Sequence, residues 1–225
     1  MRTYTVRPGD TLGRISRSVY GDAAHWRRLA SANALDDPNH LFVGQILRIP
    51  PLADPATPVV RPPDAAAARL ARAALRSTAQ VASLAPALGA RADRLLRECA
   101  AGGVRLAVKE GLRTWEKQDR LFAQGRTAPG AVVTMARGGS SYHNFGLAFD
   151  VVVLDRQGWE VWDPAHPDWR LAADVGKRLG LAWGGDWRSF RDIPHFERRG
   201  NLGLERCRQL FAAAGIRAIW LELGG

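Results

Sequence analysis

The stretch Ser141–Leu154, SYHNFGLAFDVVVL, decides how the second half of this 225-residue chain folds. Its last eight residues, Leu147–Leu154, are apolar apart from one aspartate, which is typical of a buried strand. The exception is Asp150. A buried carboxylate is costly unless a cation or good hydrogen bonds compensate its charge. We therefore expect a metal ion or an arginine beside it.

Two histidines are placed where they could join Asp150. His143 lies seven residues earlier, at the mouth of the predicted strand, and further along the chain Asp192 and His195 lie close together in the sequence DIPH. Two histidines and one carboxylate with an open position make a catalytic zinc arrangement. Isolated histidines and aspartates more often satisfy local hydrogen bonds, so the spacing alone leaves both interpretations open.

The motif around these residues resembles a known family. Residues 141–150 fit SxHxxGxAxD, which is similar to the metal motif of the zinc D-alanyl-D-alanine carboxypeptidases and L-alanyl-D-glutamate endopeptidases, proteins of the hedgehog/DD-peptidase fold. Three more segments match in the same order: GLRTWEKQ at 111–118, with Leu112 in place of the usual tyrosine, WGGDW at 183–187, and DIPHF at 192–196. The resemblance covers about residues 85–197, and WGGDW favours the endopeptidase branch.

The resemblance also implies roles for the matched residues. It implies three zinc ligands: His143, Asp150 and His195. Asp192 would be the catalytic acid and base, because a carboxylate near the attacking water can move its proton to the leaving amine. Arg113 would face the polarised carbonyl and stabilise its negative charge. Ser141 and Gln118 would orient the ligands or the substrate, and a structural role stays open for each.

The N-terminal residues 3–50 resemble a LysM domain. The match includes YTVRPGDTL at 4–12, a Tyr-Gly pair at 20–21 and GQILRIP at 44–50, in a predicted βααβ order. The resemblance implies binding of the N-acetylglucosamine-containing glycan of peptidoglycan or chitin, in a groove between about 9–12 and 35–42. Four candidate glycan-binding residues lie there: Gly9, Asp10, Thr11 and Leu12. A turn and a helix cap would use Gly9 and Asp10 equally well.

Proline placement divides the chain. Six prolines fall within residues 50–63, a composition typical of an extended linker. We expect a LysM domain at 1–50, a proline- and alanine-rich linker at 51–82, and a zinc peptidase domain at 83–225 with a C-terminal helical extension. Within the linker, Ala65–Ala82 could be a helix, and its predicted apolar side holds Leu70, Ala74, Leu75 and Val81.

Helices and strands alternate in the second part without a regular βαβ rhythm. We therefore predict an α+β class, and the resemblance implies that the central sheet is antiparallel. The expected elements include a helix at 93–101 and strands at 104–108, 131–135 and 147–154. Cys99 and Cys207 lie in apolar, helix-like surroundings and are predicted to be buried free thiols.

The charge balance restricts the partners. The chain has 32 basic and 22 acidic residues, a net charge of +10, but no block of basic residues that indicates nucleic-acid binding. A basic field favours an anionic partner such as a cell-wall polymer or a membrane surface; coding bias explains the many arginines equally well.

No apolar run reaches the ~20 residues of a spanning helix, and the first residues do not resemble a signal peptide.

Taken together, these features predict an endolysin-like peptidoglycan hydrolase. It would cut the L-alanyl-D-glutamate bond of the stem peptide with Zn²⁺ while LysM binds the glycan strand, and we expect a monomer. Release from the host cytoplasm to the wall would use a phage pore. The alternatives are a D-alanyl-D-alanine carboxypeptidase, or a non-catalytic wall-binding or phage structural protein. The complete set of four matched residues disfavours the last alternative: His143, Asp150, Asp192 and His195.

Overall fold

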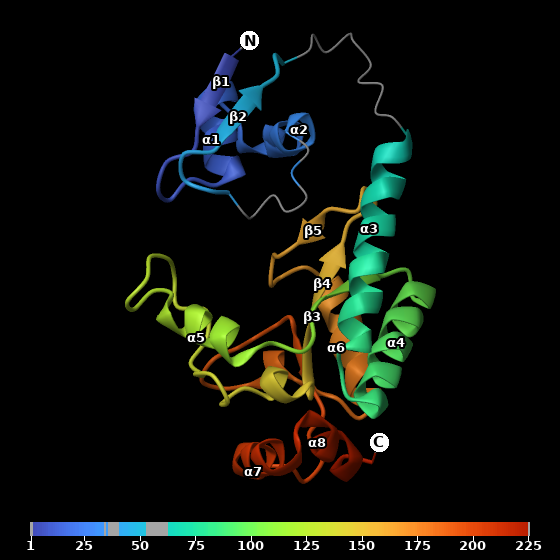
Figure 1. Cartoon of the computed structure of the whole chain (residues 1–225). Coiled ribbons are helices and arrows are strands. Elements are labelled where there is room, and N and C mark those ends of the chain that lie inside the picture. Colours follow the sequence, from blue (N-terminus) through green and yellow to red (C-terminus); the bar gives the residue numbers. More distant parts are fainter. Residues whose placement is uncertain (1, 34, 36–40, 53–62, 225) are drawn as a thin grey trace. The chain divides into compact units, whose positions relative to one another are not determined.

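The computed structural model describes residues 2–33, 35, 41–52 and 63–224 (Figure 1). The chain divides into two compact units, Met1–Ala65 and Ala66–Gly225. Residues 53–62, near the beginning of the predicted linker, and 36–40, part of the predicted glycan groove, lie outside the described residues. In the described part of the chain, no helix is both long enough and apolar enough to cross a membrane.

The first unit has the predicted βααβ order. Its elements are β1 (Arg2–Thr5), α1 (Leu12–Tyr20), the 3-10 turn η1 (Ala23–His25), α2 (Trp26–Ala32) and β2 (Ile46–Ile49). The two strands pair antiparallel, with Thr3 opposite Arg48. The helices bury Ile15 and Leu29 with Leu47 of β2 in a small core.

The cap of α1 differs from the prediction. The Thr11 hydroxyl, not Asp10, accepts the hydrogen bond from the Arg14 amide, at 3.2 Å. Asp10 instead accepts hydrogen bonds from the Tyr4 hydroxyl at 3.0 Å and from the Arg7 amide at 2.8 Å. The Asp10 carboxylate therefore stabilises the turn after β1, and Thr11 is the residue that caps α1.

An antiparallel sheet with helices around it forms the second unit, so the predicted α+β class is confirmed (Figure 1). The strand order is β3-β4-β7-β6, and β5 pairs with β4. The strands are β3 (Arg105–Glu110), β4 (Ala148–Leu154), β5 (Glu160–Val161), β6 (Ala182–Trp183) and β7 (His195–Glu197). The helices are α3 (Pro63–Ala82), α4 (Pro86–Ala101), α5 (Trp115–Ala123), α6 (Asp168–Arg178), α7 (Leu204–Ala214) and α8 (Ile216–Glu222), with short 3-10 turns η2 (Tyr142–Phe145) and η3 (Gly184–Asp186).

Both faces of β4 are covered, which explains its nearly continuous apolar sequence. Phe149, Val151 and Val153 belong to the main core together with residues of α4 and α6. The alternate residues Val152 and Leu154 belong to a smaller cluster with Ala73 of α3. Asp150 has the same parity as this second set, so it lies on their face of the strand.

Most of helix α3 lies in the second unit, which begins at Ala66, whereas the sequence placed this helix in the linker. Its buried residues are Ala73 and Ser77, while the predicted apolar-face residue Leu75 is 73% exposed. The Ser77 hydroxyl accepts a hydrogen bond from the Val108 amide at 2.7 Å. The edge strand β3 thus selects which side of α3 is buried.

The predicted strand at 131–135 is wrong: this segment has no strand pairing. Instead, the Gln118 amide nitrogen donates to the Ala136 carbonyl at 2.8 Å and to the Thr134 hydroxyl at 3.2 Å. Side chains rather than a neighbouring strand therefore bond this segment, and the Thr134 carbonyl accepts from Arg126 at 3.1 Å.

At the C-terminal end, α7 and α8 pack against the turn η2. Ile219 and Cys207 are buried, and the Trp220 indole donates to the Phe145 carbonyl at 2.9 Å. The second predicted buried thiol, Cys99, is also buried and free. The helical extension therefore supports the turn that carries His143.

Candidate metal centre

The turn that presents His143 is fixed by its own sequence. Ser141 and Asn144 form a capping box around η2, in which each side chain bonds the backbone of the other. The Asn144 amide also donates to the Arg113 carbonyl at 2.9 Å. Gly146 ends the turn at φ +66°, where a side chain would be strained and would also crowd the Ser83 carbonyl.

Three side chains converge at the end of β4. The register of β4 and β7 places His195 opposite Asp150, and η2 brings His143 to the same point. His143 Nε2 lies 3.1 Å from Asp150 Oδ1 and 3.2 Å from His195 Nδ1, and His195 Nδ1 lies 3.2 Å from the same carboxylate oxygen. In the described part of the chain this is the one group of at least three such side chains that could hold a metal ion.

The donor atoms suit a tetrahedral zinc ion. A tetrahedron with ligands ~2.0–2.1 Å from its centre has edges of about 3.4 Å, close to the 3.1–3.2 Å sides of this triangle. His143 Nδ1 lies 2.9 Å from the Gly111 carbonyl, which it can bond only as a donor, so Nε2 keeps its lone pair. His195 Nε2 lies 3.3 Å from Glu197 Oε2, which it can bond as a donor, so Nδ1 is the nitrogen that would bind the metal.

Arg113 lies behind Asp150 in the structure. Its Nη2 donates to Asp150 Oδ2 at 3.1 Å and to Glu110 Oε2 at 2.9 Å, and its Nη1 donates to Gln118 Oε1 at 2.9 Å. Arg113 is 8% exposed. The sequence offered an arginine and a metal ion as alternative ways to compensate Asp150. The structure has an arginine on Oδ2 and the two candidate histidine ligands on Oδ1.

The charges around the cluster shift its pKa values. Burial opposes the ionised form of Asp150, but His143 and His195 outweigh it and hold the pKa of Asp150 well below its ordinary value. Burial also lowers the pKa of His195, but hydrogen bonds to Asp150 and Glu197 dominate and raise it to about 9. The pKa of Arg113 is raised, because Glu110 and Asp150 outweigh the effect of its burial. The cluster is therefore built to keep its carboxylates ionised.

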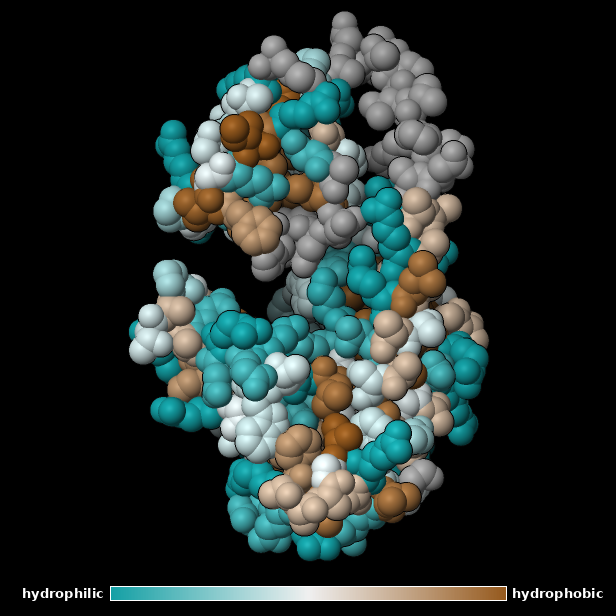
Figure 2. Space-filling model, viewed as in Figure 1, coloured by the Kyte–Doolittle hydropathy of each residue, from teal (hydrophilic) through white to brown (hydrophobic). Residues whose placement is uncertain are grey.

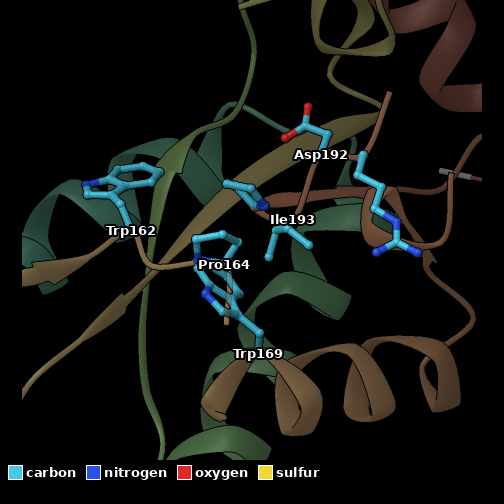
Figure 3. Close-up of a pocket in the computed structure, with 7 residues that line it drawn as sticks. Trp162, Pro164, Trp169, Asp192 and Ile193 are labelled. Carbon is cyan, nitrogen blue, oxygen red and sulfur yellow. The ribbon is translucent and has the colours of Figure 1, made fainter. Parts of the chain in front are cut away.

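Asp192 lies next to the cluster, in the turn before β7. Burial raises the pKa of this carboxyl, and the negative charge of Asp150 raises it further. A carboxyl with a raised pKa both accepts and returns a proton more readily near neutral pH. Asp192 also borders a pocket, which Figure 3 shows with Trp162 and Asp192 on opposite sides.

The two tryptophans of the WGGDW segment support this region. The Trp183 indole donates to the Ile193 carbonyl at 2.7 Å, and the Trp187 ring lies 4.9 Å from the His195 ring. Gln118 is fully buried and links Arg113 to the loop at 134–136. Ser141 acts on η2 through its cap. Each of these residues therefore contacts the cluster or its supports.

Sequence analysis missed three residues of this site. Glu197 is two residues after His195 in β7, so strand alternation places both on one face. Glu110 is the acidic end of β3, three residues before Arg113. Asn144 lies inside the quoted motif, but only the structure shows its four hydrogen bonds, two accepted and two donated. The signal that could have identified the two glutamates was their spacing, two residues after His195 and three residues before Arg113.

The candidate glycan-binding residues have structural roles in the first unit. Thr11 caps α1, Asp10 holds the preceding turn, and Leu12 is 2% exposed. Gly9 adopts φ +80°, which glycine accommodates without strain. The exposed apolar side chains lie elsewhere, at Phe42, Val43 and Ile46, and Figure 2 shows hydrophobic surface on this unit.

Comparisons with known proteins agree with this architecture. A family model described as LysM domain matches residues 4–50, and one described as D-alanyl-D-alanine carboxypeptidase matches residues 134–198. The chain is 40% identical over 131 residues to the Bacillus subtilis peptidoglycan L-alanyl-D-glutamate endopeptidase CwlK, which covers 55% of this chain and 78% of CwlK. It is 35% identical over 123 residues to the L-alanyl-D-glutamate peptidase of a Listeria phage, covering 54% of this chain and 40% of the phage protein.

Among solved structures, the Serratia marcescens L-Ala D-Glu endopeptidase ChiX matches with a TM-score of 0.39 and 26% identity, over 54% of this chain and 85% of ChiX. The fold and site define a peptidase domain accompanied by a LysM domain. Because the match covers more than two thirds of CwlK, the chain belongs to the D-alanyl-D-alanine carboxypeptidase and L-alanyl-D-glutamate endopeptidase family of metallopeptidases. The predicted family and domain types are confirmed.

Proposed function

We propose that this chain is an endolysin-like peptidoglycan hydrolase that cleaves the L-alanyl-D-glutamate bond of the stem peptide. The observation that carries the proposal is the triangle of donor atoms from His143, Asp150 and His195 with Asp192 beside it. The two relatives named for this bond, CwlK and the phage peptidase, support the choice of substrate.

The three donor atoms would hold a zinc ion. When bound, zinc supplies a Lewis acid that polarises the scissile carbonyl and lowers the pKa of water. Gly111 and Glu197 orient the two imidazoles, and Arg113 holds the second oxygen of Asp150. This arrangement presents one oxygen and two nitrogens without rearrangement, which is how outer hydrogen bonds strengthen a metal site.

Asp192 would move the proton. Its carboxylate accepts a proton from the attacking water and donates it to the amine of the departing glutamate. The resemblance implies that Arg113 faces the carbonyl, but in the structure its guanidinium donates hydrogen bonds to Asp150, Glu110 and Gln118. We therefore assign Arg113 as a positioning residue that fixes Asp150, and its positive charge favours negative charge developing nearby.

The LysM domain would bind the glycan and keep the peptidase at its substrate. Tethering raises the effective concentration of stem peptides around the site. We propose that the enzyme acts at the cell wall as a monomer, and the phage relative supports release during lysis as its route there. The apolar residues Phe42, Val43 and Ile46 offer a surface on which a sugar ring could stack.

Removal of terminal D-alanine is the second candidate, because the family model matching 134–198 has that description. Purified peptidoglycan should be incubated with the protein, with and without a chelator, and the new termini identified by mass spectrometry. We expect glutamate amino termini, one zinc per chain, and loss of both zinc and activity in His143→Ala. Release of free alanine alone would establish the second candidate, and wild-type protein without zinc would refute the metal site.

A further inference from the structure

A pocket lies beside Asp192, and none of the three candidate metal ligands lines it. It has a volume of about 210 Å³ and is lined by Trp162, Pro164, Trp169, Arg191, Asp192, Ile193 and Pro194 (Figure 3). Whole small-molecule sites have volumes of ~300–1,000 Å³. The pocket therefore has room for one residue of a longer substrate, and most of its lining is apolar or aromatic.

The walls of this pocket are held in place. The Trp169 indole donates to the Asp163 carbonyl at 3.0 Å, and this side chain is 3% exposed. Trp162 is 39% exposed, and its indole donates to Glu160 Oε2 at 3.2 Å. Glu160 is itself anchored by Lys109 at 2.7 Å. The aromatic surface is therefore formed before any ligand arrives, which reduces the ordering cost of binding.

Arg191 and Asp192 are the two charged residues of the lining. Arg191 is exposed, and no carboxylate among residues 2–33, 35, 41–52 and 63–224 pairs with its guanidinium. Arg113, which contacts the metal cluster, is by contrast engaged in ion pairs with Glu110 and Asp150. An unpaired guanidinium at the rim of a largely apolar pocket suits a substrate carboxylate, which it can bind with two parallel hydrogen bonds.

The proposed reaction identifies which substrate group reaches this position, so the inference rests on the proposed function. Asp192 donates its proton to the amine of the departing residue. In a stem peptide that residue is D-glutamate linked onward through its γ-carboxyl, so its α-carboxylate is free and lies two bonds from the protonated nitrogen. Its two methylenes are the apolar part of the same residue. The group nearest to Asp192 on the leaving side is therefore a carboxylate with an aliphatic neighbour.

We propose that this pocket is the subsite for the D-glutamyl residue, in which Arg191 binds the α-carboxylate and Trp162 contacts the methylenes. Arg191 thereby selects stem peptides whose second residue keeps a free acid over those in which it is amidated. Without Arg191, the substrate carboxylate would face the carboxyl of Asp192 alone. A hydrogen bond to a charged group contributes about tenfold to a hundredfold in affinity, and we expect discrimination in that range.

The test uses the full zinc-loaded chain and three peptides. They are N-acetyl-L-alanyl-γ-D-glutamyl-L-lysine, the same peptide with the glutamyl α-carboxyl converted to the amide, and the same peptide amidated only at the lysine carboxyl. The wild type should cleave the first and third with similar kcat/KM and the second about tenfold or more slowly. In Arg191→Gln this ratio should fall close to one, and Arg191→Lys should give an intermediate ratio.

The matched control is Arg188→Gln, because Arg188 is an exposed arginine of the same loop that does not line the pocket. It should keep the wild-type ratio. Trp162→Ala should raise KM for all three peptides alike, since the methylenes are common to them. Zinc content and circular dichroism show that each variant is folded and loaded.

Two results would overturn the subsite while leaving the proposed function intact. One is a wild type that cleaves the alanyl-glutamate bond of acid and amide peptides equally well. The other is an Arg191→Gln variant that keeps the wild-type preference. Slower cleavage of the peptide amidated at lysine would show that the enzyme recognises the lysine carboxylate rather than the glutamyl one. That result would also overturn the subsite. A wild type that cleaves none of the peptides at this bond would refute the proposed function itself.

Discussion

Replacing Arg113 by methionine tests how the structure supports Asp150. The guanidinium makes three hydrogen bonds, to Asp150, Glu110 and Gln118, at 2.9–3.1 Å, and the residue is 8% exposed. Removing one partner of a buried ion pair leaves an uncompensated charge and costs about 3–5 kcal/mol. Arg113→Met should therefore lower the free energy of unfolding of the second unit by about that amount in the presence of a chelator.

Lys117→Met is the matched control. Lys117 also pairs with Glu110, at 2.7 Å, but its side chain is 50% exposed. Pairs of this kind contribute about 0–1 kcal/mol. The contrast between the two variants therefore separates the buried contact with Asp150 from the general effect of losing one positive charge.

Urea unfolding followed by tryptophan fluorescence measures this difference. Seven of the eight tryptophans, all except Trp26, lie in the second unit, so the signal reports its unfolding. Zinc titrations should also show an affinity about 10–100-fold weaker in Arg113→Met, which is the range found when a group that orients a metal ligand is removed. If Arg113→Met costs no more than Lys117→Met, Arg113 does not compensate Asp150 and the reasoning fails.

Three further predictions concern the proton, the metal and the domains. Asp192→Asn should lower kcat at least ~100-fold while zinc content stays at the wild-type level; activity within tenfold of wild type would remove Asp192 from the mechanism. The pKa of His195 is raised to about 9, so it stabilises the metal-free chain below its ordinary pKa and loses that effect as pH rises to 9; unfolding at pH 6 and 9 in chelator should show the decrease, and a flat profile would contradict it. The chain 63–225 should keep its kcat on a soluble peptide and lose activity on intact wall, because LysM adds local concentration alone; a chain that also lacks α3 should unfold more easily, since Ala73 and Ser77 pack on the sheet.

The sequence by itself determined the elements whose evidence is local. The apolar run at 147–154 is a strand because alternating side chains are buried on both of its faces. The pattern of residues 3–50 specifies the βααβ unit, and the motifs at 141–150 and 192–196 identified the residues that converge at the metal cluster. Turn and strand geometry at these positions follows from neighbours within a few residues, so it is readable from their order.

Tertiary structure decided the features that depend on distant neighbours. Ala73 rather than Leu75 is buried because β3 packs on that side of α3. Residues 131–135 form no strand, and side chains of Gln118 and Arg126 bond the segment at 134–136 instead. The positions of Glu110 and Glu197 around the cluster follow from strand pairing, and the lining of the pocket beside Asp192 brings together residues 162–194. Such contacts join segments far apart in the chain, and their energies depend on the packed fold rather than on local sequence.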